Sequence, residues 1–317
     1  MLGNYLIRRR VFQAAGLILI CLLWLAGPIG AAENLVVDAA GRRIEVKKPF
    51  TRIISLYGAH TENLFALGLD REIIGVSPHE VYPAAAREKP VFSYHDGPEK
   101  FLAARPDLVL IRPMIERGYR QLVERLEKSG ITVVSLQPHG SEGLYRYWLE
   151  LGRLCGRVSR ARKLVADFRN RVAARRALVA EIEKRPRVYF EAIHRRMKTF
   201  APGALALFCL EAAGGVNVAA DARPVRPGSL IAPYGKERIL SHAREIDVFL
   251  AQKGTMNRVT RDTIIKEPGF SVIKAVREGR VYLVDETLIS RPTPRLLQGI
   301  DRIRELLYPD MKVREKD

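Results

Sequence analysis

The stretch that decides the fold is residues 158–184, VSRARKLVADFRNRVAARRALVAEIEK. Its apolar residues recur at steps of three and four, which predicts a helix with one apolar face. The members of this face are Val158, Ala161, Val165, Phe168, Val172, Val179 and Ile182. At roughly 1.5 Å per residue, such a helix is roughly 40 Å long and could span a small domain. Pro186 sets its latest end, because proline donates no helical hydrogen bond. A core helix of one large domain would have the same pattern, but two similar flanking halves favour a bridge between lobes.

The N-terminus has the pattern of a secretory signal peptide. Three arginines at residues 8–10 precede an apolar run at residues 11–26, and small residues follow up to Ala32. A basic segment, an apolar segment and a cleavage site with small residues are the three parts of such a signal. An uncleaved membrane anchor is the alternative, although the apolar run is short for one. We therefore expect residues 1–32 to direct export to the periplasm, with the chain membrane-anchored if the signal is not cleaved.

The composition indicates a basic globular protein. The 317 residues have a formal net charge of +18, and removing the signal with its three arginines and no acids leaves +15. Such a charge attracts nucleic acid, anionic surfaces or acidic ligands, and export makes nucleic acid the least favoured partner. Cys155 and Cys209 are the remaining cysteines. An exported location permits a disulfide, but their apolar surroundings favour two separate buried thiols.

Each half of the mature sequence alternates strand and helix patterns. In the first half, a short apolar strand at residues 52–56 is followed by a loop with Tyr57 and His60, a helix from Thr61 and a strand at residues 73–76. This βαβ unit predicts parallel strands, with the loop at their carboxyl ends, where α/β sheets bind ligands. Tyr57 and His60 are therefore candidate ligand contacts, although a single loop histidine is more often structural. The pattern recurs after residue 186.

One correspondence between the halves is specific. Glu99 begins the helix that leads into the strand at residues 107–110, and Glu237 begins the helix that leads into the strand at residues 246–251. A helix N-terminus favours a carboxylate, which could be the whole explanation. The functional alternative is a pair of equivalent acidic contacts, one on each half, that face the same partner.

Five segments, in order, resemble the Fe(III)-siderophore and cobalamin class of substrate-binding proteins of ABC importers. The similar segments are RIISL with TENLFALGL at residues 52–69 and IGV at 74–76, RPDLV at 105–109, EAAGGVNV at 211–218, GRVY at 279–282, and RPTPR at 291–295. The resemblance covers essentially the whole mature chain.

This resemblance implies an α/β fold with two Rossmann-like lobes of parallel sheet, joined by one long rigid helix. The ligand would lie between the lobes, with little hinge closure. We place the first lobe at residues 33–141, the helical linker at 142–185 and the second lobe at 186–317. The resemblance also implies that Glu99 and Glu237 dock onto arginines of a permease dimer with its ATPase. We expect a monomer with no intrinsic cofactor, whose transported ligand is a metal chelate: a ferric siderophore, a corrinoid or haem.

Several residues are candidates for binding that chelate. The segment around Tyr94 and His95 is where members of the class often place ligand contacts, and either side chain could be an axial ligand of iron or cobalt. The loop with His60 departs from the Pro-Ser pair common in the class. Guanidinium groups bind carboxylates and phosphates in fixed geometry. The remaining candidates are Arg112, His194, Arg195, Arg291 and Arg295.

The sequence offers little support for catalysis, because it has no G-x-S-x-G, P-loop, H-E-x-x-H or G-x-G-x-x-G after the first strand. Two alternatives to chelate binding stay open. A bare Zn, Mn or Fe ion would need three or four converging His, Asp or Glu ligands, and His60 and His95 supply only two. An enzyme resembling the tetrapyrrole chelatases is also two-lobed, but an export signal argues against it.

Overall fold

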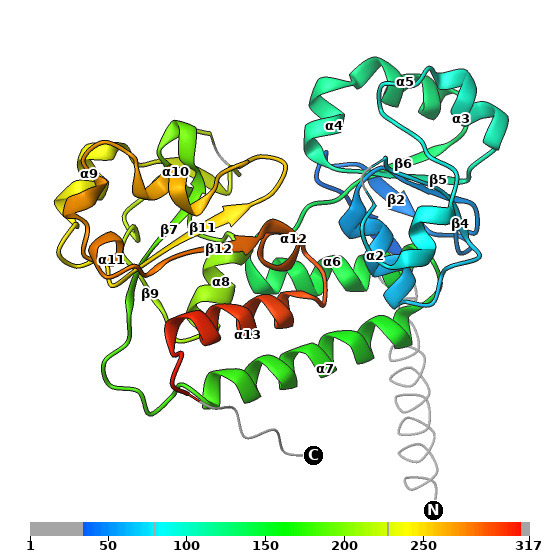
Figure 1. The fold of residues 1–317 in the computed structure, drawn as a ribbon. Helices are drawn as coiled ribbons and strands as arrows, with labels where there is room; N and C mark the ends of the chain where they lie inside the picture. Colours follow the sequence, from blue (N-terminus) through cyan, green and yellow to red (C-terminus); the bar gives the residue numbers. More distant parts are fainter. Residues whose placement is uncertain (1–33, 79, 227, 312–317) are drawn as a thin grey trace, which may run out of the picture.

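The computed structural model describes residues 34–78, 80–226 and 228–311. The predicted signal peptide lies outside these residues. Two α/β lobes stand side by side, and one long helix runs beneath both (Figure 1). None of the helices in the described part of the chain is long and apolar enough to cross a bilayer. The expected fold class, two lobes joined by a long helix, is confirmed.

The first lobe is built on a four-stranded parallel sheet in the order β4-β3-β5-β6. Its strands are β3 (Ile53–Ser55), β4 (Ile73–Val76), β5 (Leu108–Ile111) and β6 (Thr132–Ser135). They are nearly continuous buried runs, as expected of a parallel sheet covered on both faces. Its helices are α2 (Gly58–Ala66), η1 (Ala84–Glu88), α3 (Pro98–Ala104), α4 (Pro113–Gly118) and α5 (Arg120–Lys128). An antiparallel hairpin, β1 (Leu35–Val37) and β2 (Arg43–Glu45), precedes the sheet.

The second lobe is built on a six-stranded mixed sheet. Strands β7 (Arg187–Ile193), β11 (Val248–Lys253), β12 (Val281–Asp285) and β9 (Val216–Asn217) are parallel. The sequence pattern did not indicate β8 (Lys198–Phe200) and β10 (Ile231–Pro233), which add to one edge in antiparallel pairing. Its helices are η2 (His194–Arg196), α8 (Leu205–Ala212), α9 (Lys236–Ser241), α10 (Arg261–Ile265), η3 (Phe270–Val272), α11 (Lys274–Arg277), α12 (Glu286–Ile289) and α13 (Leu296–Leu307).

Two helices connect the lobes: α6 (Gly140–Leu154) and α7 (Val158–Ala177). They pack closely, because a Cβ at Gly152 would lie only 2.5 Å from the Cβ of Ala161. The predicted apolar face is buried from Ala161 to Val172, while Val158 is half-buried, and the helix ends at Ala177 instead of continuing to residue 184. The backbone there changes to i→i−3 hydrogen bonds, such as the one from the Val179 N–H to the Arg176 carbonyl. This tighter turn buries Val179 against Gly214.

A buried polar clamp ties α2 of the first lobe to the segment after α12 in the second. Arg295 donates from Nε and Nη2 to the two carboxylate oxygens of Glu62, both at 2.8 Å. The Pro292 carbonyl accepts from Asn63 Nδ2 at 2.8 Å and from Trp148 Nε1 at 3.3 Å. One apolar cluster also extends through both lobes and the linker helices. The lobes therefore share a core as well as a polar contact.

The two cysteines of the described chain are free and buried. Burial raises the pKa of the Cys155 thiol to about 12 and that of the Cys209 thiol further still. The expectation of two separate buried thiols is confirmed.

Candidate functional site

Three of the predicted ligand-binding residues lie together at the start of α2, where loops from both lobes meet. Tyr57 follows β3, and Arg112 follows β5 and lies over the Tyr57 ring, 4.9 Å from its centroid. Arg291 reaches the same place from the second lobe, since a Cβ at Gly58 would lie 2.6 Å from its Nη1. Burial raises the pKa of Tyr57, and the two arginines oppose this rise.

Two buried polar atoms lie beside Gly58 without hydrogen-bond partners. They are Arg291 Nη1 and Glu80 Oε2. The other oxygen of Glu80 accepts from Ser77 Oγ at 2.5 Å and from Thr61 Oγ1 at 3.1 Å. Burial raises the pKa of Glu80. Glycine at position 58 leaves room for the guanidinium, and the two buried atoms keep unused hydrogen-bonding capacity there.

The sequence suggested that His60 lies in a loop, but in the structure it lies in the first turn of α2. The backbone already turns at Tyr57, whose carbonyl accepts from the His60 N–H at 2.8 Å, and this turn points the side chain inward. His60 has no exposed surface, and burial lowers its pKa to about 4. Because a carbonyl can only accept, Nε2 donates to the Ile111 carbonyl at 2.9 Å, and Nδ1 accepts from Tyr147 Oη at 2.6 Å. Both ring nitrogens are therefore occupied.

The same chain of hydrogen bonds continues to the other lobe. Tyr147 Oη accepts from Asn63 Nδ2 at 3.2 Å, and Asn63 also donates to the Pro292 carbonyl. Arg295 is likewise engaged, by Glu62 and by the ring of Tyr82 at 4.8 Å. The structure thus places His60 and Arg295 in the clamp beside the site, and Tyr57, Arg112 and Arg291 at its surface.

Tyr94 and His95 form a second group, in the first lobe. Their rings are 4.6 Å apart, and Tyr94 is also 4.6 Å from the ring of Tyr119. The Tyr119 hydroxyl lies 3.2 Å from His95 Nδ1. This group, which we call the aromatic trio, offers phenol and imidazole groups that could ligate a metal or pack on a planar chelate.

His194 and Arg195 form a third group, directly after β7. Arg195 is exposed and has no ion pair among the described residues. His194 is buried, with Nδ1 2.8 Å from Glu191 Oε2 and Nε2 3.5 Å from Glu267 Oε2. The hydrogen bond to Glu191 raises the pKa of His194, while burial raises that of Glu191. The structure places His194 as a buried neighbour of the exposed arginine.

Sequence reasoning missed Tyr119, Glu80 and Glu191. Tyr119 lies at a helix start 24 residues beyond His95, and no spacing relates the two. Glu80 follows β4, so its position at a strand's carboxyl end was an available signal. Glu191 lies within an uninterrupted run of buried residues in β7, and a charge at such a position could have indicated a buried polar contact.

The two predicted docking glutamates have matching local geometry. Glu99 is the second residue of α3 after the N-cap Gly97, and Glu237 is the second residue of α9 after the N-cap Gly235. The Glu99 carboxylate folds back onto Gly97, where a Cβ would clash with it, whereas Glu237 Oε2 would lie 3.4 Å from a Cβ at Gly235, in ordinary contact. Both glutamates are exposed, and neither has an ion pair within residues 34–311 as described. α3 and α9 lie on the outer sides of the two lobes (Figure 1).

Among the residues that the structure describes, no group of three or more His, Cys, Asp or Glu is arranged to hold a metal ion. The polar groups described above are guanidinium, phenol and imidazole groups with the carboxyls of Glu80, Glu191 and Glu267. They suit the periphery of a ligand that brings its own metal better than direct coordination of a bare ion.

A comparison with protein families matches residues 53–288 to the model of the family described as periplasmic binding protein. The chain belongs to the periplasmic binding protein family. The match spans most of the described chain and includes both Glu99 and Glu237. The resemblance drawn from the sequence is confirmed.

Individual relatives agree with this assignment. The chain is 25% identical over 287 residues to the uncharacterized ABC transporter substrate-binding lipoprotein YvrC of Bacillus subtilis, covering 86% of this chain and 85% of that protein. It is 26% identical over 277 residues to a cobalamin-binding protein of Halobacterium salinarum, covering 86% and 73%. A solved structure, of a possible iron-binding periplasmic solute-binding protein from Staphylococcus epidermidis, is 26% identical. It superposes with a TM-score of 0.72 and covers 82% of this chain and 100% of that one.

Proposed function

We propose that this periplasmic binding protein captures a metal chelate between its lobes and delivers it to the permease dimer of an ABC importer. The main observation behind the proposal is that Glu99 and Glu237 occupy equivalent positions on the two lobes. Each is the second residue of a helix on its own lobe, exposed and unpaired within the described chain. A homodimeric permease presents two equivalent surfaces, which two equivalent carboxylates suit.

The groups between the lobes support an anionic chelate as the ligand. Arg112 and Arg195 have no ion pair among the described residues, and Arg291 has only the nearby Glu80 carboxyl, with which it forms no hydrogen bond. By contrast, Glu62 is already neutralised by Arg295. A surplus of unpaired guanidinium groups favours ligands with carboxylates, phosphates or catecholate oxygens. The aromatic trio would pack against the body of the chelate, with Tyr94 or His95 as its axial ligand if the metal has an open position.

The remaining expectations complete this proposal. Residues 1–32 would export the chain to the periplasm, and the mature protein would act as a monomer without a cofactor of its own. The domain limits at residues 141 and 186 would separate two lobes that hold the ligand with little closure. ABC-importer relatives support the permease and its ATPase as partners.

Native mass spectrometry of the mature chain tests the ligand. The chain is incubated in parallel with cyanocobalamin, haemin, ferric siderophores and bare Fe, Zn and Mn ions. We expect a one-to-one complex with one chelate, weakened about tenfold or more by Arg291→Ala, because a charge-assisted hydrogen bond contributes about 1.5–3 kcal/mol. Arg171→Ala, on α7, is the matched control and should have no effect. Binding of a bare ion alone would instead support a metal-ion importer.

Uptake of the bound chelate by the producing cells tests delivery. The double variant with Glu99→Arg and Glu237→Arg should lose uptake while the purified protein keeps its ligand affinity. Each single variant should lose part of the activity, and its difference from the unchanged protein should shrink as salt rises, because salt screens the exposed ion pairs that the unchanged protein makes. Unchanged uptake in the double variant would rule out these glutamates as docking residues.

A further inference from the structure

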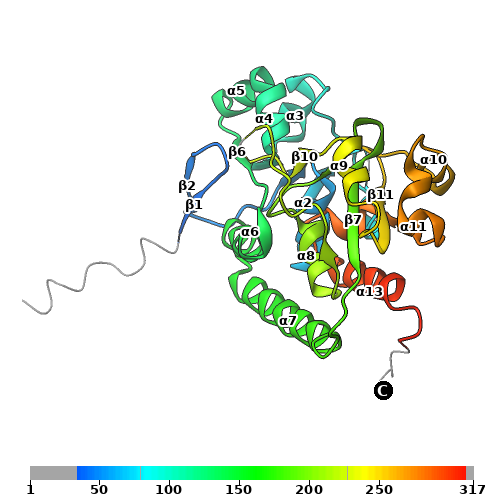
Figure 2. The ribbon, with the colours of Figure 1, turned by 90° about the vertical axis from the view of Figure 1, so that its left-hand side faces the viewer.

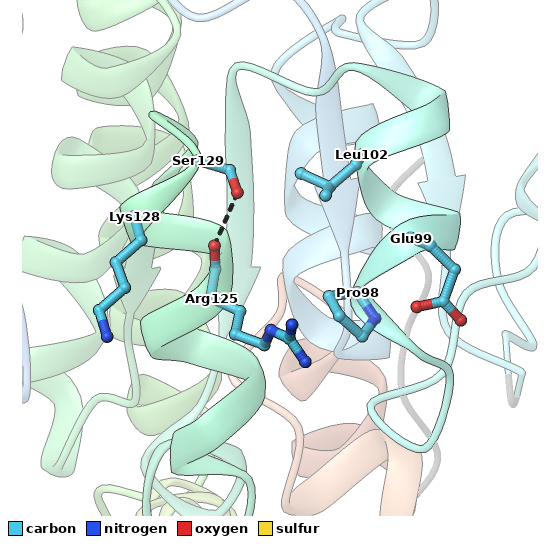
Figure 3. A pocket seen from close by; sticks show the side chains of 6 residues that line it. All are labelled: Pro98, Glu99, Leu102, Arg125, Lys128 and Ser129. Atoms are coloured by element: carbon cyan, nitrogen blue, oxygen red, sulfur yellow. Dashed lines mark hydrogen bonds between the residues drawn. The ribbon is translucent and has the colours of Figure 1, made fainter.

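A groove of about 300 Å³ runs between α3 and α5, directly beside Glu99 (Figure 3). Its lining residues are Pro98, Glu99, Leu102, Arg125, Lys128 and Ser129. Pro98 and Leu102 form an apolar wall on α3, and Leu102 is 41% exposed. A leucine exposed to this degree in a groove is suited to contact with another apolar side chain.

The opposite wall is basic. In Figure 3 the guanidinium of Arg125 points into the space between the two helices, while Ser129 Oγ donates to the Arg125 carbonyl at 2.9 Å. Neither Arg125 nor Lys128 has a carboxylate partner in the described part of the chain. By contrast, Arg120 on the same helix does have a carboxylate partner, because it pairs with Glu124 at 2.8 Å. Two cations on α5 are therefore left unpaired, Arg125 directed towards α3 and Lys128 directed away from it at the rim of the groove (Figure 3).

The surface around Glu237 lacks these unpaired cations. Lys236 and Arg238 flank Glu237, but Lys236 pairs with Glu267 and Arg238 pairs with Asp221. Arg238 also lies over the ring of Tyr234, 4.1 Å from its centroid. The two docking glutamates are thus equivalent in position, while their surroundings differ in charge.

We propose that the α3–α5 groove is a second contact with the permease and receives a periplasmic segment of it. That segment would place an apolar side chain against Leu102 and a carboxylate on Arg125, next to the arginine that binds Glu99, with Lys128 adding positive charge at the rim. This inference rests on the proposed function, because it assumes docking through Glu99. A segment with both charge signs fits a groove with both signs, and a permease without the carboxylate would leave two cations unpaired. The groove would then select this permease among related importers.

The first measurement is binding of the fluorescently labelled mature chain to washed spheroplasts of the cells that produce it. Changing Arg125→Glu and Lys128→Glu together should weaken binding by about five- to tenfold, as expected for reversing two rim charges. The matched control is Arg171→Glu with Lys184→Glu. It changes the net charge equally at two exposed residues in and just beyond α7, which lies away from α3 and α5 (Figures 1 and 2). Both double variants should keep their affinity for the chelate.

The second measurement identifies the occupant. A photo-crosslinker at position 102 should join the permease, at a peptide with an acidic residue. Crosslinking to a second copy of this chain, or to a protein other than the permease, would overturn the inference. The inference would also be overturned by a second outcome. In it, the variant Arg125→Glu with Lys128→Glu binds as well as the control, although Glu99→Arg with Glu237→Arg abolishes binding. If the glutamate variants bind normally, the proposed function fails and the groove inference fails with it.

Discussion

Arg295 in the second lobe holds both carboxylate oxygens of Glu62 in the first, at 2.8 Å each, and the Glu62 side chain is only 2% exposed. The pair joins residues 233 positions apart in the chain. An arginine that the sequence suggested as a ligand contact is thereby committed to holding the lobes together.

Removing one partner of this pair should destabilise the protein strongly. Arg295→Met leaves Glu62 buried without a counter-charge, which typically costs about 3–5 kcal/mol of unfolding free energy. The double variant with Glu62→Met should lose far less, because no charge is then left unpaired. Urea unfolding of the single and double variants measures both values. Normal stability of Arg295→Met with weaker chelate binding would instead make Arg295 a ligand residue.

His60 should make the protein sensitive to acid. Its pKa falls from about 6.5 in the unfolded chain to about 4 in the folded one, so between these pH values the unfolded chain binds the extra proton. Stability from this residue is complete above about pH 6.5 and should decline by roughly 3 kcal/mol by pH 4. We expect His60→Gln to lack this part of the pH dependence in urea unfolding. Parallel curves for both proteins would contradict the assignment.

Gly58→Ala should weaken ligand binding without unfolding the protein. The added Cβ would displace the Arg291 guanidinium, the flexible end of its side chain. We therefore expect a change of less than about 1 kcal/mol in stability but about tenfold lower affinity for the chelate. Gly118→Ala is the control, because nothing lies within 4 Å of its added Cβ. Equal affinity of the two variants would remove Arg291 from the site.

Gly152→Ala should separate the linker helices. Its Cβ would meet the Ala161 Cβ at 2.5 Å and the Arg157 carbonyl at 3.2 Å, and overpacking of this kind costs about 1–3 kcal/mol. Gly143→Ala on the same helix has its nearest neighbour at 3.6 Å and should be neutral or slightly stabilising. Thermal unfolding compares the two. Similar melting temperatures would mean that α6 and α7 can adjust.

The sequence allowed prediction of the features that depend on local pattern. The apolar runs at residues 53–55 and 108–111 became parallel strands, and the spacing of Ala161 and Phe168 became the buried face of α7. The positions of Glu99 and Glu237 near helix starts could be predicted from the sequence and are confirmed, while their docking role stays a prediction.

Features that depend on distant partners could not be predicted. Nothing near Arg295 in the sequence indicates Glu62, and nothing near His60 indicates Tyr147, 87 residues away. Strands β8 and β10 have three residues each, too few for a periodic pattern. They are held in place by pairing with β7 and with each other.

The burial of Cys155 and Cys209 has a practical consequence. Both thiols are shielded and have raised pKa values, so little reactive thiolate exists at neutral pH. A cysteine introduced at the exposed Val225 or Met256 of the mature chain would therefore react with a maleimide dye ahead of the native pair. The protein can serve, with its own cysteines in place, as a fluorescent sensor that reports each step of capture and docking from a chosen position.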